Sequence, residues 1–465
     1  MLSAAVESPA ASILLKRGAG MKILHVSQGL PPFRTGGLNL YCRDLMREQA
    51  REHSVALLYP GSFRPGATRI RPRRGEGIRL FEIINPLPLP LIFGVSAPAR
   101  YMAPCAAGCY EVFLKKWRFD VIHIHCLMGV HREFFEAARA LGVPMVFTTH
   151  DYYPLCARCN FFDARGRLCP GAEPARCQAC NAGKGLSRKA EILMQSRLYE
   201  KLKYTGAMKL LRAKGRKKAE SGPHTPGAPA EEFRALAEYY LSVLRLIGLF
   251  HCNSDTARDI YAKALPEARF VTLPITAGGI PPGTAAAPHA KPDGRLRIGY
   301  LGGERTDKGL SVLLAALERL DARGLTGWEL YLYGGQYAAV PGGKRIRRCG
   351  TYTPEQLPKV YGALDIAAVP SIWYETFGLV TREALSYGVP AVVSDRVGSA
   401  MLLKNAPVPL TYPAEDAAAL ADVLAALFDA DAYAKAAEWA AHSDAALPME
   451  THTQDVLRLY RTLTG

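Results

Sequence analysis

The sequence predicts an α/β protein with two Rossmann-like, doubly wound parallel sheets that face a common cleft. Short apolar runs alternate with helical patterns, and this series occurs twice, on either side of a stretch rich in Gly, Pro and Ala at residues 274–293. Strands buried on both faces appear as continuous apolar runs, and their alternation with helices is typical of parallel sheets. With 465 residues, 49% of them hydrophobic, the chain can form two cores, which excludes a disordered chain and a small disulfide scaffold.

Each series contains four predicted strands that are short and apolar. In the first series they lie at residues 22–27, 54–59, 121–125 and 144–148. In the second they lie at residues 296–301, 328–333, 366–370 and 391–394. The first strand is followed by a loop that contains Gly and Pro, and then by a helical pattern at residues 38–52. The cleft between the carboxyl ends of two such sheets is where this architecture binds ligands.

We expect an N-terminal domain at residues 21–275 and a C-terminal domain at residues 294–450. An insertion at about 155–235 holds clustered cysteines and a basic run, and an amphipathic helix at residues 451–465 can pack back across the cleft. No stretch reaches the ~18 uninterrupted apolar residues of a membrane span, and residues 1–20 do not form a signal peptide. The sequence therefore predicts a cytoplasmic protein.

The net charge of +16 is concentrated in one segment. Residues 184–218 contain 12 Lys and Arg, opposed only by Glu191 and Glu200. Because apolar residues recur there at helical spacing, one interpretation is a cationic helix on the inner face of an anionic membrane. The other is a solvated helical hairpin. Binding of nucleic acid by this segment is disfavoured, since few aromatic residues lie between the basic ones.

Two glutamates flank the predicted start of a helix in the second series. Glu375 lies in the loop after the strand at 366–370, and Glu383 lies within the helix that begins near Gly378. Free amides at a helix start bind phosphates, and carboxylates accept hydrogen bonds from sugar or ribose hydroxyls. The alternative is that both glutamates only complement the helix dipole. The Pro-Ser before them and the Phe-Gly-Leu between them favour a sugar-nucleotide site.

In this motif the chain resembles glycosyltransferase family 4, whose members are retaining enzymes of the GT-B fold. The resemblance runs from about residue 21 to the C-terminus and is weaker in the cysteine-rich insertion. It implies that the domain at residues 21–275 forms the acceptor side and that the domain at residues 294–450 binds the nucleotide sugar. It also implies that Glu375 contacts the donor sugar and that Glu383 holds the ribose. It also implies backbone contacts to the donor phosphate and sugar. These come from Phe377, Gly378 and Leu379.

A second motif, Lys308-Gly309, opens the helix after the first strand of the second series. The resemblance implies that Lys308 neutralises the leaving diphosphate together with an arginine five residues earlier. Gly303 occupies that arginine position here, so Arg305 is the candidate substitute. The alternative for Lys308 is an ordinary surface lysine at a helix start.

Two further positions match the family in the first series. Gly36 and Gly37 follow the first strand, where the family has a glycine loop that approaches the donor phosphates, although a plain turn explains them equally well. His150 follows the strand at 144–148, where the family has a histidine beside the reacting sugar. His123 and His125 lie within the preceding strand, and we interpret them as core residues.

Five cysteines fall within 25 positions of the insertion. Two Cys-x2-Cys pairs, formed by Cys156 with Cys159 and by Cys177 with Cys180, can supply four thiolates to a structural Zn²⁺ or an iron–sulfur cluster. Cys169 is then the spare cysteine or an alternative ligand. Disulfide pairing is the competing interpretation. The resemblance implies no metal in the transfer reaction itself.

The sequence thus predicts a retaining hexosyltransferase of class EC 2.4. Its catalytic residues are His150, Glu375 and Lys308, its co-substrate is a nucleotide diphospho-sugar, and its acceptor is a glycan or lipid-linked hydroxyl in glycan, polysaccharide or glycolipid biosynthesis. A sugar-nucleotide epimerase or a phosphorylase on the same fold is one alternative. A metal-containing nucleic-acid-binding protein is the other.

Overall fold

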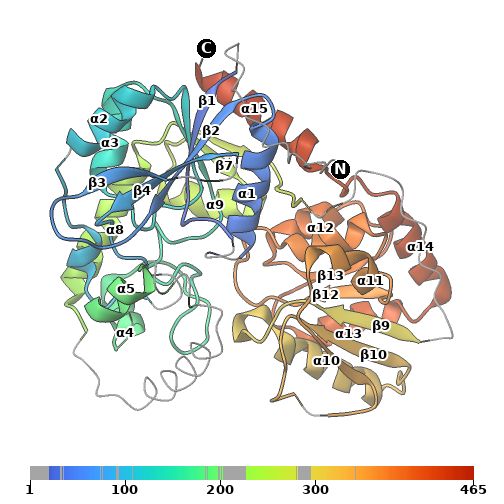
Figure 1. The fold of residues 1–465 in the computed structure, drawn as a ribbon. Helices are drawn as coiled ribbons and strands as arrows, with labels where there is room; N and C mark the ends of the chain where they lie inside the picture. Colours follow the sequence, from blue (N-terminus) through green and yellow to red (C-terminus); the bar gives the residue numbers. More distant parts are fainter. Residues whose placement is uncertain are drawn as a thin grey trace, which may run out of the picture.

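The computed structural model contains two separate sheets, each covered by helices (Figure 1). It describes residues 20–464, except for short internal gaps and two longer ones at 203–226 and 281–294. The short gaps lie at 32–33, 35, 74, 76, 91–93, 107, 184, 186, 197–198, 200–201, 279 and 341. Most of the basic run at 184–218 therefore lies outside the described residues.

The described strands of the first domain form an eight-stranded sheet in the order β3-β4-β2-β1-β5-β6-β7-β8. The strands are β1 (Lys22–Val26), β2 (Ser54–Pro60), β3 (Arg69–Arg73), β4 (Arg79–Ile84), β5 (Val121–Ile124), β6 (Met145–Thr148), β7 (Leu249–Cys252) and β8 (Phe270–Thr272). All neighbouring pairs are parallel except β3 with β4. The prediction of a parallel sheet is confirmed, with the correction that its first edge strand is antiparallel.

The second domain has six described strands, all parallel, in the order β11-β10-β9-β12-β13-β14. They are β9 (Leu296–Tyr300), β10 (Trp328–Tyr333), β11 (Ile346–Gly350), β12 (Ile366–Val369), β13 (Ala391–Ser394) and β14 (Thr411–Tyr412). This is the doubly wound order in which the chain reverses direction between the first and fourth strands. Ligands bind such sheets outside the carboxyl ends of the strands at this reversal, here between β9 and β12.

Helices pack on both sheets. In the first domain they are α1 (Gly37–Gln49), α2 (Gly108–Trp117), α3 (Arg132–Ala140), α4 (Pro174–Asn181), α5 (Arg188–Met194), α8 (Ala230–Leu244) and α9 (Asp255–Ala264). In the second they are α10 (Leu310–Ala322), α11 (Leu357–Tyr361), α12 (Leu379–Ser386), α13 (Ala417–Ala426) and α14 (Ala430–Ala441). Side chains cap several of them, as where Ser254 accepts from the Ala257 amide at the start of α9. Short 3-10 turns include η2 (Thr306–Lys308) and η4 (Gly398–Leu403).

The last helix, α15 (Met449–Thr464), follows the second domain in sequence but packs on the first (Figure 1). It lies beside α1. Val456, Leu457 and Tyr460 on its apolar face join one buried cluster with Ile23 of β1 and Leu45 of α1. The helix therefore ties the end of the chain to the first domain through apolar burial.

The described part of the predicted insertion is compact. Cys156, Cys159, Cys169 and Cys177 are partly buried against the core of the first domain, and α4, which contains Cys177, contacts α8. In the described part of the chain, no helix combines the length and apolarity needed to cross a membrane.

Replacement of Leu457 by alanine tests the packing of α15. Leu457 is 2% exposed in the cluster shared with α1 and β1, so Leu457→Ala should lower the free energy of unfolding by about 2–5 kcal/mol. Chemical denaturation against Gln454→Ala, a change on the exposed face of the same helix, measures the difference. Equal midpoints for the two variants would contradict this placement of α15.

Candidate functional site

Two loops of the second domain meet at the carboxyl edge of its sheet. One follows β9 and leads to η2, and the other follows β12 and leads to α12. The Ile372 amide donates to the carbonyl of Asp307 at 3.0 Å. Gly309 has a φ of +73°, and a Cβ there would lie 1.7 Å from the carbonyl oxygen of Pro370. Only glycine allows this approach, which holds Lys308 against the second loop.

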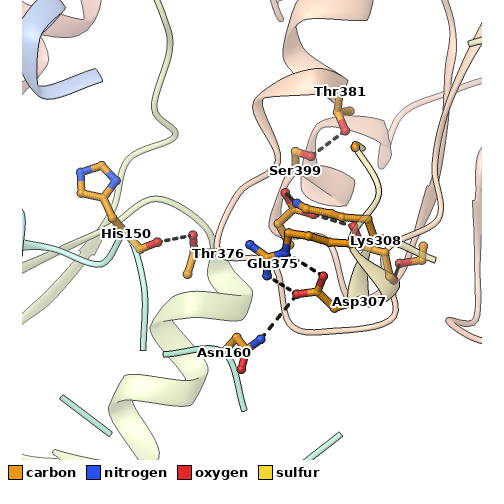
Figure 2. A network of polar contacts seen from close by, with 12 residues as sticks. His150, Asn160, Asp307, Lys308, Glu375, Thr376, Thr381 and Ser399 are labelled. Atoms are coloured by element: carbon orange, nitrogen blue, oxygen red, sulfur yellow. Dashed lines mark hydrogen bonds and ion pairs between the residues drawn. The ribbon is translucent and has the colours of Figure 1, made fainter. Parts of the chain in front are cut away.

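An ion pair between Lys308 and Glu375 joins the two loops (Figure 2). The Lys308 Nζ lies 2.6 Å from Oε1 of Glu375, and the Ser371 hydroxyl donates to Oε2 at 2.6 Å. The backbone of Glu375 is also fixed, because its amide donates to the Arg396 carbonyl and its own carbonyl accepts from Gly398. Both predicted catalytic residues of this domain are thus brought together, and the carboxylate is oriented at both oxygens.

Helix α12 begins directly after this carboxylate. Its N-cap is Gly378, with a φ of +89° and no side-chain cap, so the first amides of the helix are left for another partner. A Cβ at Gly378 would lie 2.7 Å from Val397, and the Ser399 amide donates to the carbonyl of Phe377 at 2.6 Å. The turn from Phe377 to Leu379 is therefore held by η4, with its amide groups at the edge of the sheet.

The glycine loop of the first domain lies opposite this turn. Gly36 is the N-cap of α1, with a φ of 132° and no side-chain cap. A Cβ on Gly37 would lie 3.9 Å from Cδ1 of Leu379, the first residue of α12. The uncapped starts of two helices thus meet across the domain junction. Because each carries the positive end of a helix dipole, they can share one anion.

Glu383 lies on α12, one turn beyond its start. Its Oε2 accepts a hydrogen bond of 3.1 Å from the hydroxyl of Tyr361. Burial raises the pKa of Glu383, and the hydrogen bond from Tyr361 opposes that shift. The structure therefore separates the two glutamates by environment, since Glu375 is paired with a cation and Glu383 with a neutral hydroxyl.

Arg305 and Gly303 lie in the loop after β9. Arg305 forms an ion pair with the buried carboxylate of Asp307, with 2.9 Å between Nε and Oδ1, and its guanidinium lies 5.7 Å from the ring of Trp373. Lys308 lies 5.4 Å from the same ring, so both cations border one indole. Gly303 has a φ of +70° and forms the turn that brings the chain from β9 to Arg305.

His150 lies at the junction of the two domains (Figure 2). Its carbonyl accepts a hydrogen bond from the Thr376 hydroxyl at 3.0 Å. Because Thr376 directly follows Glu375, this bond brings the backbone of His150 close to that of Glu375. Its ring packs 4.9 Å from that of Tyr41 on α1. Burial lowers the pKa of His150 to about 3 and raises that of Asp151 to about 6. The imidazole is therefore neutral near pH 7.

The cysteines of the predicted metal site are all unpaired thiols, so disulfide pairing is not seen among them. Among the described residues, the one group with three metal-ligating atoms within 4.8 Å of one another is His25, His123 and His125. Cys156, Cys159, Cys177, Cys180 and the spare Cys169 form no such group. The zinc or iron–sulfur site remains a prediction.

Five residues of the site were not predicted from the sequence, and two of them are Tyr361, which bonds Glu383, and Trp373, which borders Arg305 and Lys308. Ser371 and Thr376 hold Glu375 and His150 in place, and Asp307 holds Arg305. Ser371 and Thr376 lie inside the motif that contains Glu375, and Asp307 precedes Lys308 directly. Their position next to the predicted residues was the one sequence feature that could have identified them. Their contacts join separate loops and cross the domain boundary, and no local sequence pattern specifies such contacts.

Two families match the chain, one for each domain. Residues 35–175 match the family described as Glycosyltransferase Family 4, and residues 295–430 match Glycosyl transferases group 1. Together the matches include Gly36, His150, Lys308, Glu375 and Glu383.

Solved structures of similar fold cover nearly the whole chain. Sucrose-phosphate synthase from Thermosynechococcus elongatus has a TM-score of 0.53 and 16% identity, over 95% of this chain and 99% of that one. HepE from Anabaena, solved with UDP, has a TM-score of 0.56 and 14% identity, over 95% of this chain and 100% of that one. At this identity the likeness shows the shared fold, which is GT-B.

Curated relatives match over shorter segments. D-inositol 3-phosphate glycosyltransferase from Corynebacterium efficiens is 42% identical over 88 residues, 19% of this chain and 20% of that protein. Phosphatidyl-myo-inositol mannosyltransferase from Mycobacterium leprae is 42% identical over 67 residues, 14% of this chain and 18% of that protein. The chain thus spans about a fifth of the length of these relatives. By its two domain matches and its fold, the chain belongs to the glycosyltransferases of family 4 with the GT-B fold.

Proposed function

We propose that this protein is a retaining hexosyltransferase that moves a sugar from a nucleotide diphospho-sugar to an acceptor hydroxyl. The observation that carries the proposal is the meeting of two uncapped helix starts, α1 and α12, beside the ion pair of Lys308 and Glu375. The helix starts suit a diphosphate, and the carboxylate suits the hydroxyls of the attached sugar. HepE from Anabaena, which shares the fold, was solved with UDP and with UDP-glucose, which supports a donor of this class.

In the proposed reaction the bond between the anomeric carbon and the β-phosphate oxygen breaks, and a bond to the acceptor oxygen forms. The acceptor proton passes to the departing diphosphate on the same face of the sugar, which retains the anomeric configuration. Lys308 and the amides of α1 and α12 stabilise the charge that develops on the leaving group, and this stabilisation lowers the barrier. Glu375 holds the donor sugar, and Glu383 holds the ribose. Arg305 adds positive charge beside Lys308.

The acceptor we propose is a polyol phosphate or a glycolipid precursor. The relatives named D-inositol 3-phosphate glycosyltransferase and phosphatidyl-myo-inositol mannosyltransferase support this class. Such an acceptor can lie at a membrane surface. Helix α5 supports a surface contact, because Ile192 and Leu193 are 41% and 51% exposed within the basic run. A peripheral position at the inner face of the membrane, through residues 184–218, is part of the proposal.

A structural zinc at the cysteine loop completes the proposal. Burial raises the pKa of the Cys156 thiol, and backbone hydrogen bonds to this sulfur from Arg158, Phe161 and Asn160 oppose the shift. These amide hydrogen bonds offset part of the cost of burying a thiolate at this position, and a metal ion would have to displace the remaining thiol proton. Because the four thiols are not yet clustered, zinc binding would draw Cys177 and Cys180 of α4 toward the loop and order it.

Removal of either charge of the ion pair should greatly slow transfer. Lys308→Ala and Glu375→Gln should each lower kcat/KM by about 10²-fold or more, because charge stabilisation at the leaving group and positioning of the sugar are lost. Release of nucleoside diphosphate from UDP- and GDP-sugars, with and without acceptor, measures this. Lys344→Ala, an exposed lysine of the same domain, is the matched control. Wild-type rates in folded Lys308→Ala and Glu375→Gln enzymes would refute the assignment, and acceptor-independent conversion without nucleoside diphosphate would indicate an epimerase.

Zinc content tests the cysteine loop. Elemental analysis of the purified chain should give about one zinc per molecule, and Cys156→Ser and Cys177→Ser should each lose it and lower the thermal midpoint. Cys349→Ser removes an exposed thiol of the other domain and should retain the metal. Iron with acid-labile sulfide would show a cluster in place of zinc, and a metal-free, stable chain would remove the site altogether.

Vesicle sedimentation tests the surface contact. The wild type should bind vesicles that contain anionic lipid, bind less as salt is raised, and bind zwitterionic vesicles weakly. A double change of Ile192 and Leu193 to serine should weaken binding several-fold. Val112→Ser removes an apolar side chain that is 67% exposed on α2 and should leave binding unchanged. Equal binding by all three proteins would rule out α5 as the contact.

A further inference from the structure

A line of buried polar side chains leads from His150 into the first domain. It crosses strands β5, β1, β6 and β7 and includes one residue each from α1 and α15. Thr148 and His251 are register partners, as are His25 and His123, so these side chains lie side by side across the sheet. Apart from His150 at its end, no side chain in the line is more than 1% exposed. Polar groups this deeply buried must satisfy one another.

Eight hydrogen bonds connect the line without a break, and we name it the histidine chain. In order from the junction it joins His150, His125, His25, Gln49, Tyr460, His123, Thr148, His251 and the carbonyl of Leu273. The donor–acceptor distances run from 2.6 Å, between Tyr460 and His123, to 3.3 Å, between His150 and His125.

Every histidine of the chain is neutral near pH 7. Burial lowers the pKa of His25 and His251 to about 4 each and that of His150 to about 3. It also lowers the pKa of His123 and His125 well below the usual range, with the neighbouring histidines adding to the effect. A neutral imidazole has one N–H donor and one acceptor nitrogen. If one nitrogen of a histidine in the chain donates a hydrogen bond, its other nitrogen must therefore accept one. The role of one nitrogen thus fixes the role of the next residue in the chain.

The carbonyl oxygen of Leu273 sets that direction, because it can only accept. His251 must donate to it from Nε2, so Nδ1 of His251 accepts from the Thr148 hydroxyl. With its proton used, Thr148 accepts from Nε2 of His123, and Nδ1 of His123 accepts from the hydroxyl of Tyr460. Tyr460 in turn accepts from the amide nitrogen of Gln49.

The second half of the chain follows from the orientation of Gln49. Its Oε1 accepts from Nε2 of His25, so Nδ1 of His25 accepts from Nε2 of His125. Nδ1 of His125 then accepts from Nε2 of His150. The proton of His150 is thereby placed on Nε2, and its Nδ1 carries a lone pair. Among the described residues this nitrogen has no hydrogen-bond partner, and His150 keeps accessible surface.

A metal ion at His25, His123 and His125 is the competing use of these side chains. Metal ligation needs a free lone pair from each imidazole, directed at the ion. All six ring nitrogens of the three histidines are already engaged in the histidine chain. The polar line is therefore satisfied as a hydrogen-bonded chain, and a metal would have to break it.

We propose that the histidine chain locks His150 in the Nε2–H tautomer, so that its Nδ1 accepts a hydrogen bond from a hydroxyl of the bound sugar. This rests on the proposed function for the identity of the ligand, although the lock itself does not. Gln49, His25 and His125 are then positioning residues. The opposite tautomer would present an N–H to the junction and could only donate. A hydroxyl ligand would lose an acceptor that helps to orient it.

Nitrogen NMR of protein labelled with ¹⁵N-histidine tests the lock directly, without any sugar nucleotide. In the wild type, His150, His125, His25, His123 and His251 should each show one protonated Nε2 and one unprotonated Nδ1, unchanged between pH 6 and 8. A protonated Nδ1 at His150, or averaged signals of both tautomers, would overturn the proposal. So would stoichiometric metal bound at His25, His123 and His125.

Two variants break the chain at a distance from His150. Gln49→Met removes the acceptor of His25, and Thr148→Val cuts the link to the Leu273 carbonyl, so in both the His150 signals should move toward a mixture of tautomers. Tyr41→Phe is the matched control. The ring of Tyr41 packs beside that of His150, but its buried hydroxyl bonds His452 and does not belong to the histidine chain. An unchanged His150 tautomer in both chain variants, or an equal change in Tyr41→Phe, would show that the chain does not set it.

Kinetics then connect the tautomer to transfer. Gln49→Met should lower kcat/KM by about tenfold or more. In serine proteases a wrong histidine tautomer lowers kcat by ~10⁴-fold, so a loss of activity is the expected sign. Full activity with a mixed His150 tautomer would overturn the role in sugar binding. The two proposals fail separately, because an inactive wild type with a locked His150 would refute only the transferase reaction.

Discussion

The hydrogen bonds of Thr376 hold the two domains together at the site. The hydroxyl of Thr376 donates to the carbonyl of His150, and its carbonyl accepts from the hydroxyl of Ser254 at 2.6 Å. One residue of the second domain thereby fixes the ends of β6 and β7 of the first. Because Thr376 lies between Glu375 and the start of α12, the same contact sets where the carboxylate and the helix amides stand relative to α1. The distance between Gly37 and Leu379 depends on it.

Close backbone packing at the same junction explains several glycines. A Cβ on Gly398 would lie 2.4 Å from both Ser254 Oγ and the carbonyl oxygen of Thr376, and a Cβ on Gly309 would collide with the carbonyl of Pro370. Larger residues at these positions would open the junction and separate Lys308 from Glu375. The glycines therefore affect the site by allowing the two loops and the two domains to approach closely. Lys308 and Glu375 affect it by their charges.

The sequence was sufficient for the elements whose pattern is local. The strands β10 and β13 have the predicted bounds, and β1, β2, β9 and β12 differ by a residue at most at either end, because each is a continuous apolar run. Six described strands were missed. In the edge strands β3 and β11, arginines interrupt the apolar pattern where one side of the strand faces solvent. The others are β4, β7, β8 and β14, of which β8 and β14 have only three and two residues. Lys308 and Glu375 were proposed from their motifs. Their 2.6 Å contact depends on two loops 67 residues apart, which no local pattern specifies.

The histidines show most clearly what local patterns leave out. His123 and His125 were interpreted as core residues, and both are buried. Burial alone does not explain a polar side chain, because it is costly unless the side chain is hydrogen-bonded. Its partners decide the rest, and for these two histidines they come from α15, from strands β1 and β6, and from His150. Since each partner satisfies one nitrogen of the next histidine, the chain has a polar atom left over only at its two ends. Leu273 closes one end, and the other is Nδ1 of His150, the residue whose carbonyl accepts from Thr376 of the second domain. A buried network that is complete everywhere except at the domain junction leaves its one remaining acceptor on His150, and this is the nitrogen that we propose for a sugar hydroxyl.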